Sequence, residues 1–186
     1  MTGRSLLLQV AAALDAAGIK WMLTGSFAAA HHGALRTTRD VDLVIEATER
    51  QLQSLVVDII ARGLYAAEDA ALEARRVEGM FNVIDPGSGW KADLILKKGR
   101  PFSLAEFERR SPILLDGIPL SIATLEDLML SKLEWARMGG SLRQLEDVAA
   151  LLRARAGEWD EAYVRRWVEE LGLSDEWARA RKLVAE

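Results

Sequence analysis

The chain lacks several residue types on which common functional sites depend. Its 186 residues include no cysteine, and its two histidines, His31 and His32, are adjacent. Without cysteine there is no disulfide framework, no thiolate zinc site and no cysteine nucleophile. Neighbouring residues on a helix point about 100° apart, so the two histidines are not expected to hold one ion together. We interpret both as structural, with a direct role for either as the alternative.

Long apolar runs and an excess of positive charge are also missing. No segment is long enough to span a membrane, and the apolar stretch 6–10 is too short for a signal peptide. Lys and Arg number 24 against 28 Asp and Glu, which gives a formal net charge of −4. This balance is no general sign of nucleic-acid binding, although a local basic patch is compatible with it. We expect a cytoplasmic globular protein with no membrane partner.

Two aspartates, Asp40 and Asp42, stand in an apolar segment that is predicted to be a strand. Residues two apart in a strand share a face, so the carboxylates project together while Val41 and Leu43 point into a core. Paired carboxylates repel each other and are costly to bury unless a positive charge lies between them. Because oxygen ligands favour a hard ion, the pair predicts a site for Mg²⁺ or Mn²⁺.

The segment before this pair is typical of a phosphate site. A predicted strand over 21–23 is followed by the turn Thr24-Gly25-Ser26 and a short helix over 28–32. Gly25 lets the backbone approach a ligand closely. Ser26 stands where the helix is expected to begin, and free N–H groups and the helix dipole favour anions there. A phosphate turn followed by a metal-binding Asp pair indicates a nucleoside triphosphate site.

A third carboxylate, Asp93, lies in the apolar segment 90–96. The sequence DPGSG over 85–89 is a strong turn signal and joins this segment to another predicted strand over 80–84. The second strand of this hairpin is therefore expected to place Asp93 in the sheet. The alternative is a surface aspartate on an edge strand. We interpret Asp85 as a turn former rather than a catalytic residue.

These motifs resemble a known family. Gly25-Ser26, followed about a dozen residues later by Asp40-Val41-Asp42-Leu43, resembles the signature of the nucleotidyltransferase fold shared with DNA polymerase beta. The resemblance covers roughly residues 21–152. It implies that Asp40, Asp42 and Asp93 are the catalytic residues and the ligands of Mg²⁺ or Mn²⁺, with a nucleoside triphosphate as substrate.

The downstream segment resembles a narrower group. Glu126, Asp127 and Lys132, followed by Arg143 and Asp147, are similar to the small bacterial nucleotidyltransferases of the AbiEii type, known from toxin–antitoxin and phage-defence systems. This resemblance implies a cognate antitoxin or another partner protein as a possible binding partner.

Three cations are candidates for binding the phosphates. Arg36 and Arg39 lie in the loop before the Asp pair, where they either reach the triphosphate or remain solvated. Lys132 falls in the apolar stripe of a predicted helix, so it needs a partner. That partner is the triphosphate, which the resemblance favours, or an acidic residue, or water. We interpret Asp147, four residues after Arg143, as half of a surface ion pair.

The remaining pattern predicts an α+β fold, with a mixed β-sheet flanked by helices and a C-terminal helical region. We expect a nucleotidyltransferase-like core over residues 1–100. Residues 101–186 are expected to add a short hairpin, with its turn at Asp116-Gly117, and helices that pack on the core. Three of the six tryptophans fall in the last helices, where packing is the simpler interpretation than stacking on a base.

The predicted function is metal-dependent transfer of a nucleoside monophosphate from a nucleoside triphosphate. The acceptor remains open between a small molecule, a tRNA end and a protein, and the protein is a candidate toxin–antitoxin or defence component. Gly25, Ser26, Arg39 and Lys132 are the predicted nucleotide-binding residues. The alternative is a catalytically degenerate nucleotide-binding protein that forms one half of a two-component complex.

Overall fold

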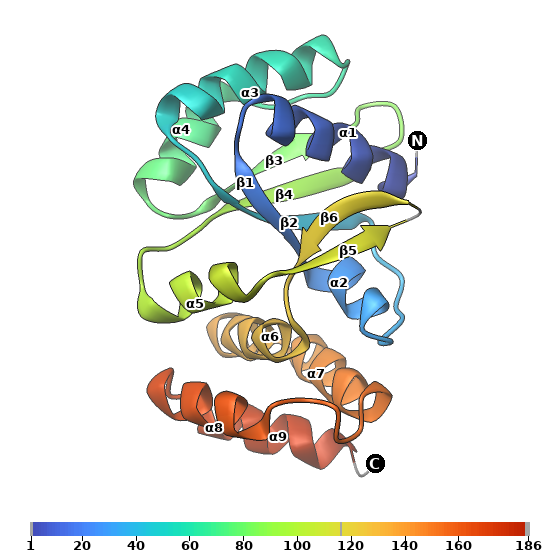
Figure 1. The fold of residues 1–186 in the computed structure, drawn as a ribbon, viewed down its shortest axis with the longest axis vertical. Helices are drawn as coiled ribbons and strands as arrows, with labels where there is room; N and C mark the ends of the chain where they lie inside the picture. The colour runs from blue at the N-terminus through green and yellow to red at the C-terminus, as the bar shows by residue number, and fades with distance from the viewer. Residues whose placement is uncertain (1, 116, 185–186) are drawn as a thin grey trace.

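A mixed six-stranded sheet forms the centre of the computed structural model, which describes residues 2–115 and 117–184 (Figure 1). The strands are β1 (Lys20–Thr24), β2 (Asp40–Glu46), β3 (Met80–Ile84), β4 (Lys91–Leu96), β5 (Ser111–Leu115) and β6 (Ile118–Ile122). The helices are α1 (Gly3–Ala16), α2 (Gly25–His31), α3 (Glu49–Ala61), α4 (Glu68–Arg76), α5 (Pro101–Arg109), α6 (Leu125–Gly139), α7 (Leu142–Ala154), α8 (Glu161–Glu170) and α9 (Ser174–Val184).

The strand order, β3-β4-β2-β1-β6-β5, places β2 in the interior of the sheet. β2 pairs in parallel with β4 and antiparallel with β1. In this register Asp42 lies opposite Asp93 on one side and opposite Thr24 on the other. Because paired residues of neighbouring strands share a face, the three polar side chains form one row across the sheet.

The two faces of β2 have different neighbours. Val41, Leu43 and Ile45 are fully buried on one face, and α1 contacts β2 and β4 there while packing against α3. The other face carries Asp40 and Asp42 and looks toward α2 and the helices that follow residue 124 (Figure 1). The period of two therefore separates a hydrophobic core from a polar face, as the sequence predicts.

The structure corrects the start of the helix predicted over 28–32. α2 begins at Gly25, immediately after β1, and Thr24 is its N-terminal flanking residue without a side-chain cap. There is no separate turn before it. Ser26 is buried within the first turn of α2 instead of standing at an open helix end.

The hairpin predicted beyond residue 100 is present and joins the sheet. β5 and β6 pair antiparallel, and β6 lies next to β1 in parallel. The sheet therefore extends past residue 100, although the division into two domains stays a prediction. Half of the predicted turn, Asp116, lies outside the described residues.

The C-terminal helices form a layer below the sheet in Figure 1. Thr124 caps α6 by accepting a hydrogen bond from the backbone N–H of Asp127, and Gly140 ends α6 with a φ of 61°. Trp167 and Trp177 are buried, and Trp177 packs edge-on against Trp159 with ring centroids 5.8 Å apart. The packing interpretation of these tryptophans is confirmed. In the described part of the chain, no helix is long and apolar enough to cross a membrane.

Candidate active site

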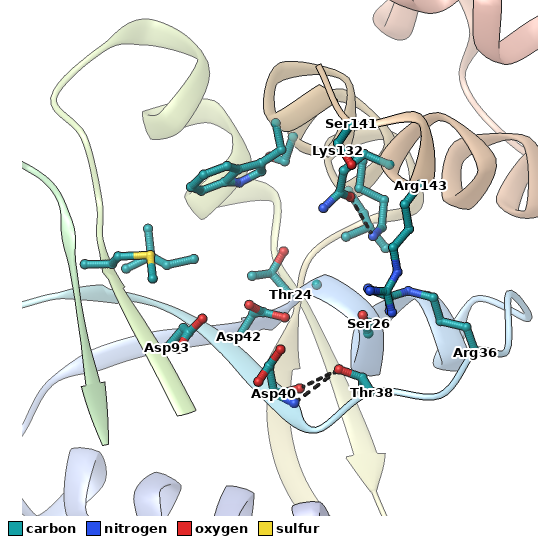
Figure 2. Close-up of a pocket in the computed structure, with 17 residues that line it drawn as sticks. Thr24, Ser26, Arg36, Thr38, Asp40, Asp42, Asp93, Lys132, Ser141 and Arg143 are labelled. Atoms are coloured by element: carbon teal, nitrogen blue, oxygen red, sulfur yellow. Dashed lines mark hydrogen bonds between the residues drawn. The ribbon is translucent and has the colours of Figure 1, made fainter. Parts of the chain in front are cut away.

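A cavity of about 390 Å³ separates the polar face of the sheet from α6 and α7. One wall is acidic and consists of Asp40, Asp42 and Asp93 from β2 and β4. The facing wall is basic and consists of Arg36, Lys132 and Arg143. Figure 2 shows the three carboxylates on one side and the three cations on the other. We call these the acidic wall and the basic wall.

Asp42 is the most constrained carboxylate of the acidic wall. Gly25 has a φ of +62°, and a Cβ atom there would lie 1.9 Å from Oδ2 of Asp42. Glycine is therefore required at this position to make room for Asp42, a role that the sequence alone assigned to a ligand. The backbone N–H of Ser26 donates to the same carboxylate. That N–H group is thus not free for a phosphate as the structure stands.

The charge of Asp42 is not fully compensated. Burial raises the pKa of Asp42 above its usual value, and the neighbouring charge of Asp93 raises it further. Lys132 and the Ser26 hydrogen bond act in the opposite direction but do not cancel this increase. A nearby cation stabilises the ionised form of such a buried carboxylate, so Asp42 is a favourable position for binding one.

Asp93 is held by two donors. Nδ2 of Asn82 donates to its Oδ1 at 2.6 Å, and Nζ of Lys91 lies 3.2 and 3.1 Å from its two carboxylate oxygens. The strand is an interior one and the Asp93 side chain is only 11% exposed, so the surface interpretation of Asp93 is wrong.

Lys91 connects the two ends of the acidic wall. Its Nζ also lies 3.6 Å from Oδ1 of Asp40. Burial lowers the pKa of Lys91, but the hydrogen bond and charge of Asp93 and the charge of Asp40 outweigh it, so the pKa is raised. Within residues 2–115 and 117–184, no three acidic or histidine side chains converge closely enough to hold a metal ion as they stand. Lys91 supplies the positive charge in this arrangement.

The basic wall is organised by a single buried carboxylate. Oδ2 of Asp147 lies 2.6 Å from Nζ of Lys132 and 3.0 Å from Nε of Arg36. The interpretation of Asp147 as a surface partner of Arg143 is therefore wrong, because α7 turns this side chain inward against α6. Burial lowers the pKa of Lys132, and its ion pair with Asp147 opposes that effect. Nη2 of Arg143 donates to the backbone oxygen of Thr37 at 3.5 Å.

The structure brings most of the predicted site residues together. Gly25, Ser26 and Lys132 line the cavity with the three aspartates. Arg39 is exposed and does not line it, whereas Arg36 from the same loop does. The catalytic and binding roles of all these residues stay predictions.

The histidines do not enter the cavity. Nε2 of His32 lies 2.9 Å from the backbone oxygen of Ala123, and burial lowers its pKa. His31 is exposed. This placement agrees with a structural interpretation of His32.

Sequence reasoning gave no role to three residues for which a local signal existed: Trp135 and Gln144 line the cavity, and Lys91 lies beside its acidic wall. Lys91 is two residues before Asp93 on the same face of a strand, so the spacing predicts that its ammonium group lies beside that carboxylate. Trp135 is one helical turn after Lys132, and Gln144 is about one turn before Asp147. Spacing alone therefore placed each of them next to a residue already under consideration.

Solved structures with the same fold include proteins of known activity. No protein-family model matches the chain, and no curated protein matches its sequence. The solution structure of the antibiotic-resistance factor ANT(2'')-Ia aligns over 97% of this chain and 88% of its own length, with a TM-score of 0.51 and 13% identity. The crystal structure of ANT(2'')-Ia in complex with adenylyl-2''-tobramycin aligns over 97% and 96%, with a TM-score of 0.51 and 14% identity.

A third structure decides the fold. An antigenic nucleotidyltransferase-like protein from Paracoccidioides brasiliensis aligns over 95% of this chain and 91% of its own, with a TM-score of 0.52 and 15% identity. The chain has the nucleotidyltransferase fold. The predicted fold class is confirmed. At these identities the likeness shows the fold alone, and the narrower resemblance to AbiEii-type proteins stays a prediction.

Proposed function

We propose that the protein is a nucleotidyltransferase that transfers a nucleoside monophosphate from a nucleoside triphosphate to an acceptor. The observation that supports this most is the pairing of an acidic wall with a basic wall across one cavity. A nucleoside triphosphate with its divalent ion has the complementary distribution of charge. The ion seeks carboxylate oxygens, while the phosphates seek guanidinium and ammonium groups.

The acidic wall fits a hard divalent ion in its chemistry. All three donors are carboxylates, and burial, followed by the charge of Asp93, raises the pKa of Asp42, so a cation beside it would be stabilising. Asp40, Asp42 and Asp93 would hold Mg²⁺ or Mn²⁺ once Lys91 moves away from Asp40 and Asp93. When bound, such ions neutralise charge on the phosphates and make the acceptor hydroxyl more acidic.

The protein's own residues have distinct tasks in this proposal. Lys132, Arg36 and Arg143 bind the β- and γ-phosphates and stabilise the pyrophosphate as it leaves. Ser26, with its hydroxyl at the cavity, and Gly25 border the same phosphates. The acceptor oxygen forms a bond to the α-phosphorus, and the bond from that phosphorus to the bridging oxygen breaks. Asp93 accepts the proton of the acceptor hydroxyl.

The wider biological role of the protein has two candidates. A toxin–antitoxin or defence component, with a cognate partner protein, follows from the AbiEii-type resemblance. A degenerate nucleotide-binding subunit is the second candidate, because a lysine neutralises the carboxylates in the structure. The presence of three carboxylates at the cavity favours the enzyme.

The test is incubation with each α-labelled nucleoside triphosphate and Mg²⁺, together with total tRNA, a small-molecule extract and the protein itself. ATP comes first, since an adenylylated small molecule is bound by ANT(2'')-Ia. We expect label in a new product, and we expect its loss in Asp93→Asn. Mg²⁺-dependent nucleotide binding without transfer would establish the degenerate subunit instead. Neither binding nor transfer would refute both.

A further inference from the structure

A second cavity of about 430 Å³ adjoins the first. It follows the end of β4 past Ile95 to Leu96 and Lys98, and is closed by α6 and by the segment 77–80. The two cavities share five lining residues and are therefore direct neighbours. These are Thr24, Met80, Ile95, Ser131 and Trp135. None of the residues of the acidic or basic wall lines the second cavity.

The rim of this second cavity is unusually apolar for an exposed surface. Trp135 is 45% exposed and Met80 is 42% exposed, and the exposures of Val77 and Met138 are higher still. Trp135 and Met138 come from α6, Val77 directly follows α4, and Met80 is the first residue of β3. Exposed apolar groups that gather at one concave site, rather than lying singly, indicate a binding surface.

The direction of the reaction assigns this cavity to one substrate. In an in-line displacement, the attacking oxygen and the leaving oxygen lie on opposite sides of the phosphorus. The leaving pyrophosphate belongs to the basic wall, so the acceptor must arrive from the far side of the acidic wall. Ile95 is two residues after Asp93 on β4 and Val44 is two residues after Asp42 on β2, and both line the second cavity, whereas Arg36 of the basic wall precedes β2. The second cavity therefore opens on that far side.

We infer that the second cavity is the acceptor site, and that the acceptor is a small molecule with a flat apolar body that stacks on Trp135. This inference rests on the proposed function and names its substrate class. Cavities of about 300–1,000 Å³ are typical binding sites of small organic ligands. An indole ring offers a face of that shape at the junction of the two cavities.

Polar groups at the floor of this cavity can orient such a molecule. Glu106 is buried, accepts a hydrogen bond from the Ser131 hydroxyl at 2.7 Å, and lines the cavity with it. Burial raises the pKa of Glu106 to about 7, so the carboxyl group is partly protonated at neutral pH and can donate a hydrogen bond. Glu134, by contrast, is occupied by a bidentate pair with Arg100 at 2.5 Å.

The absence of cysteine makes a direct test possible. Val77→Cys places a single thiol at the rim of the second cavity, and Val57→Cys, on α3 and 67% exposed, is the matched control away from both cavities. Each variant is equilibrated with three cystamine disulfides under a fixed concentration of 2-mercaptoethanol. One disulfide carries 2-naphthoic acid, one gluconic acid and one 6-aminohexanoic acid. Intact-protein mass spectrometry measures the fraction captured.

We expect the Val77→Cys variant to capture the naphthoyl fragment in preference to the other two by about tenfold, equivalent to about 1.4 kcal/mol. The Val57→Cys variant should capture all three equally. Adding Trp135→Ala to the Val77→Cys variant should remove most of the preference. A preference for the polyol or the cation, or equal capture of all three, would overturn the inference.

A second measurement separates the acceptor from the nucleoside. Capture is repeated with Mg²⁺ and the non-transferable analogue α,β-methylene-ATP. If the naphthoyl fragment is still captured, the two sites are distinct, as we infer. If the nucleotide abolishes capture, the second cavity holds the nucleoside base and the inference is wrong. None of these measurements needs turnover, so their failure is independent of whether the protein transfers a nucleotide.

Discussion

The two walls of the cavity are built by different physical means. The acidic wall comes from adjacent strands in fixed register, with Asp42 opposite Asp93, so its geometry follows from backbone pairing. The basic wall comes from the loop that carries Arg36 and from the consecutive helices α6 and α7, which lie far from that loop in the sequence. It is assembled around one buried carboxylate, Asp147, which binds both Lys132 and Arg36. The first wall is placed by hydrogen-bond register and the second by a buried ionic cluster.

The walls also differ in how their charge is balanced. The basic wall contains its own counter-ion, since Asp147 compensates part of its positive charge. The acidic wall depends on Lys91, whose Nζ approaches Asp93 and Asp40, while the pKa of Asp42 stays raised. The acidic wall therefore gains most from an added cation, and the basic wall is already organised without a ligand. Four predictions test this difference.

The largest effect is expected for Asp42→Asn. This change keeps the shape of the side chain but removes one of the three carboxylates that would bind the metal. We expect the rate of label transfer to fall by about 10³-fold, because charge stabilisation by the ion is worth several kcal/mol. The measurement is the initial rate with α-labelled nucleotide. Asp58→Asn, which removes an acid paired with Arg62 on the surface of α3, should leave the rate unchanged.

An unchanged rate in Asp42→Asn would show that the acidic wall is not catalytic. A parallel loss in Asp58→Asn would point to net charge rather than to this site.

The same division explains what the sequence could predict. Alternation of period two placed Asp40, Asp42 and Asp93 correctly, because a strand's faces follow directly from its sequence. The apolar stripe also identified Lys132 as a lysine that needs a partner. That partner, Asp147, was assigned to the surface because its environment depends on how α7 packs against α6. Arg36 and Arg39 differ only in the path of a loop, which no local pattern specifies.

The second cavity was beyond sequence reasoning for a similar reason. Trp135 comes from α6, whereas Val77 and Met80 come from the segment 77–80, and only the tertiary packing brings them to one rim.

The second prediction concerns the centre of the basic wall. Asp147→Ala leaves Lys132 and Arg36 close together without their shared counter-ion, and Lys132 is buried. We expect the free energy of unfolding to fall by about 3–5 kcal/mol, the usual result of breaking a buried ion pair from one side. Urea denaturation measures it. Glu161→Ala, which breaks an exposed pair with Arg165, should cost about 0.5 kcal/mol or less.

If Asp147→Ala costs no more than the exposed pair, then Asp147 does not organise the basic wall. The double variant Lys132→Met/Asp147→Leu should recover much of the lost stability, since it removes the charges together.

The third prediction concerns the counter-ion of the acidic wall. Lys91→Met removes the ammonium group that competes with a metal ion for Asp93 and Asp40. We expect Mn²⁺ to bind about tenfold more tightly in the absence of nucleotide, equivalent to about 1.4 kcal/mol. Electron paramagnetic resonance of free Mn²⁺ measures the affinity. Lys20→Met removes the same charge at an exposed site and should change it little. Weaker binding in Lys91→Met would mean that Lys91 supports the metal site instead of competing for it.

The smallest expected effect is on stability rather than catalysis. It is the pH dependence of the free energy of unfolding of the metal-free wild type and of Asp42→Asn. The pKa of Asp42 is raised in the folded protein, by burial and then by Asp93, so the folded state holds this proton more tightly than the unfolded state. Metal-free stability therefore falls as the pH rises from the usual pKa of an aspartate through the raised one. Asp42→Asn has no such proton to lose. Without metal, the stability of this variant relative to the wild type should rise with pH through that window. At neutral pH the difference should be on the order of 1 kcal/mol, within the range of ordinary single substitutions.

Urea denaturation of both proteins in EDTA, at a series of pH values, measures this difference. Other carboxylates, such as Glu46 with its lowered pKa, titrate in both proteins and cancel from the comparison. Saturating Mg²⁺ should reverse the order, because only the wild type gains stability from binding the ion. A variant that is less stable than the wild type at neutral pH without metal would show that Lys132 and the Ser26 N–H already compensate the charge of Asp42. The acidic wall would then be as self-contained as the basic wall, and the contrast between the two walls would disappear.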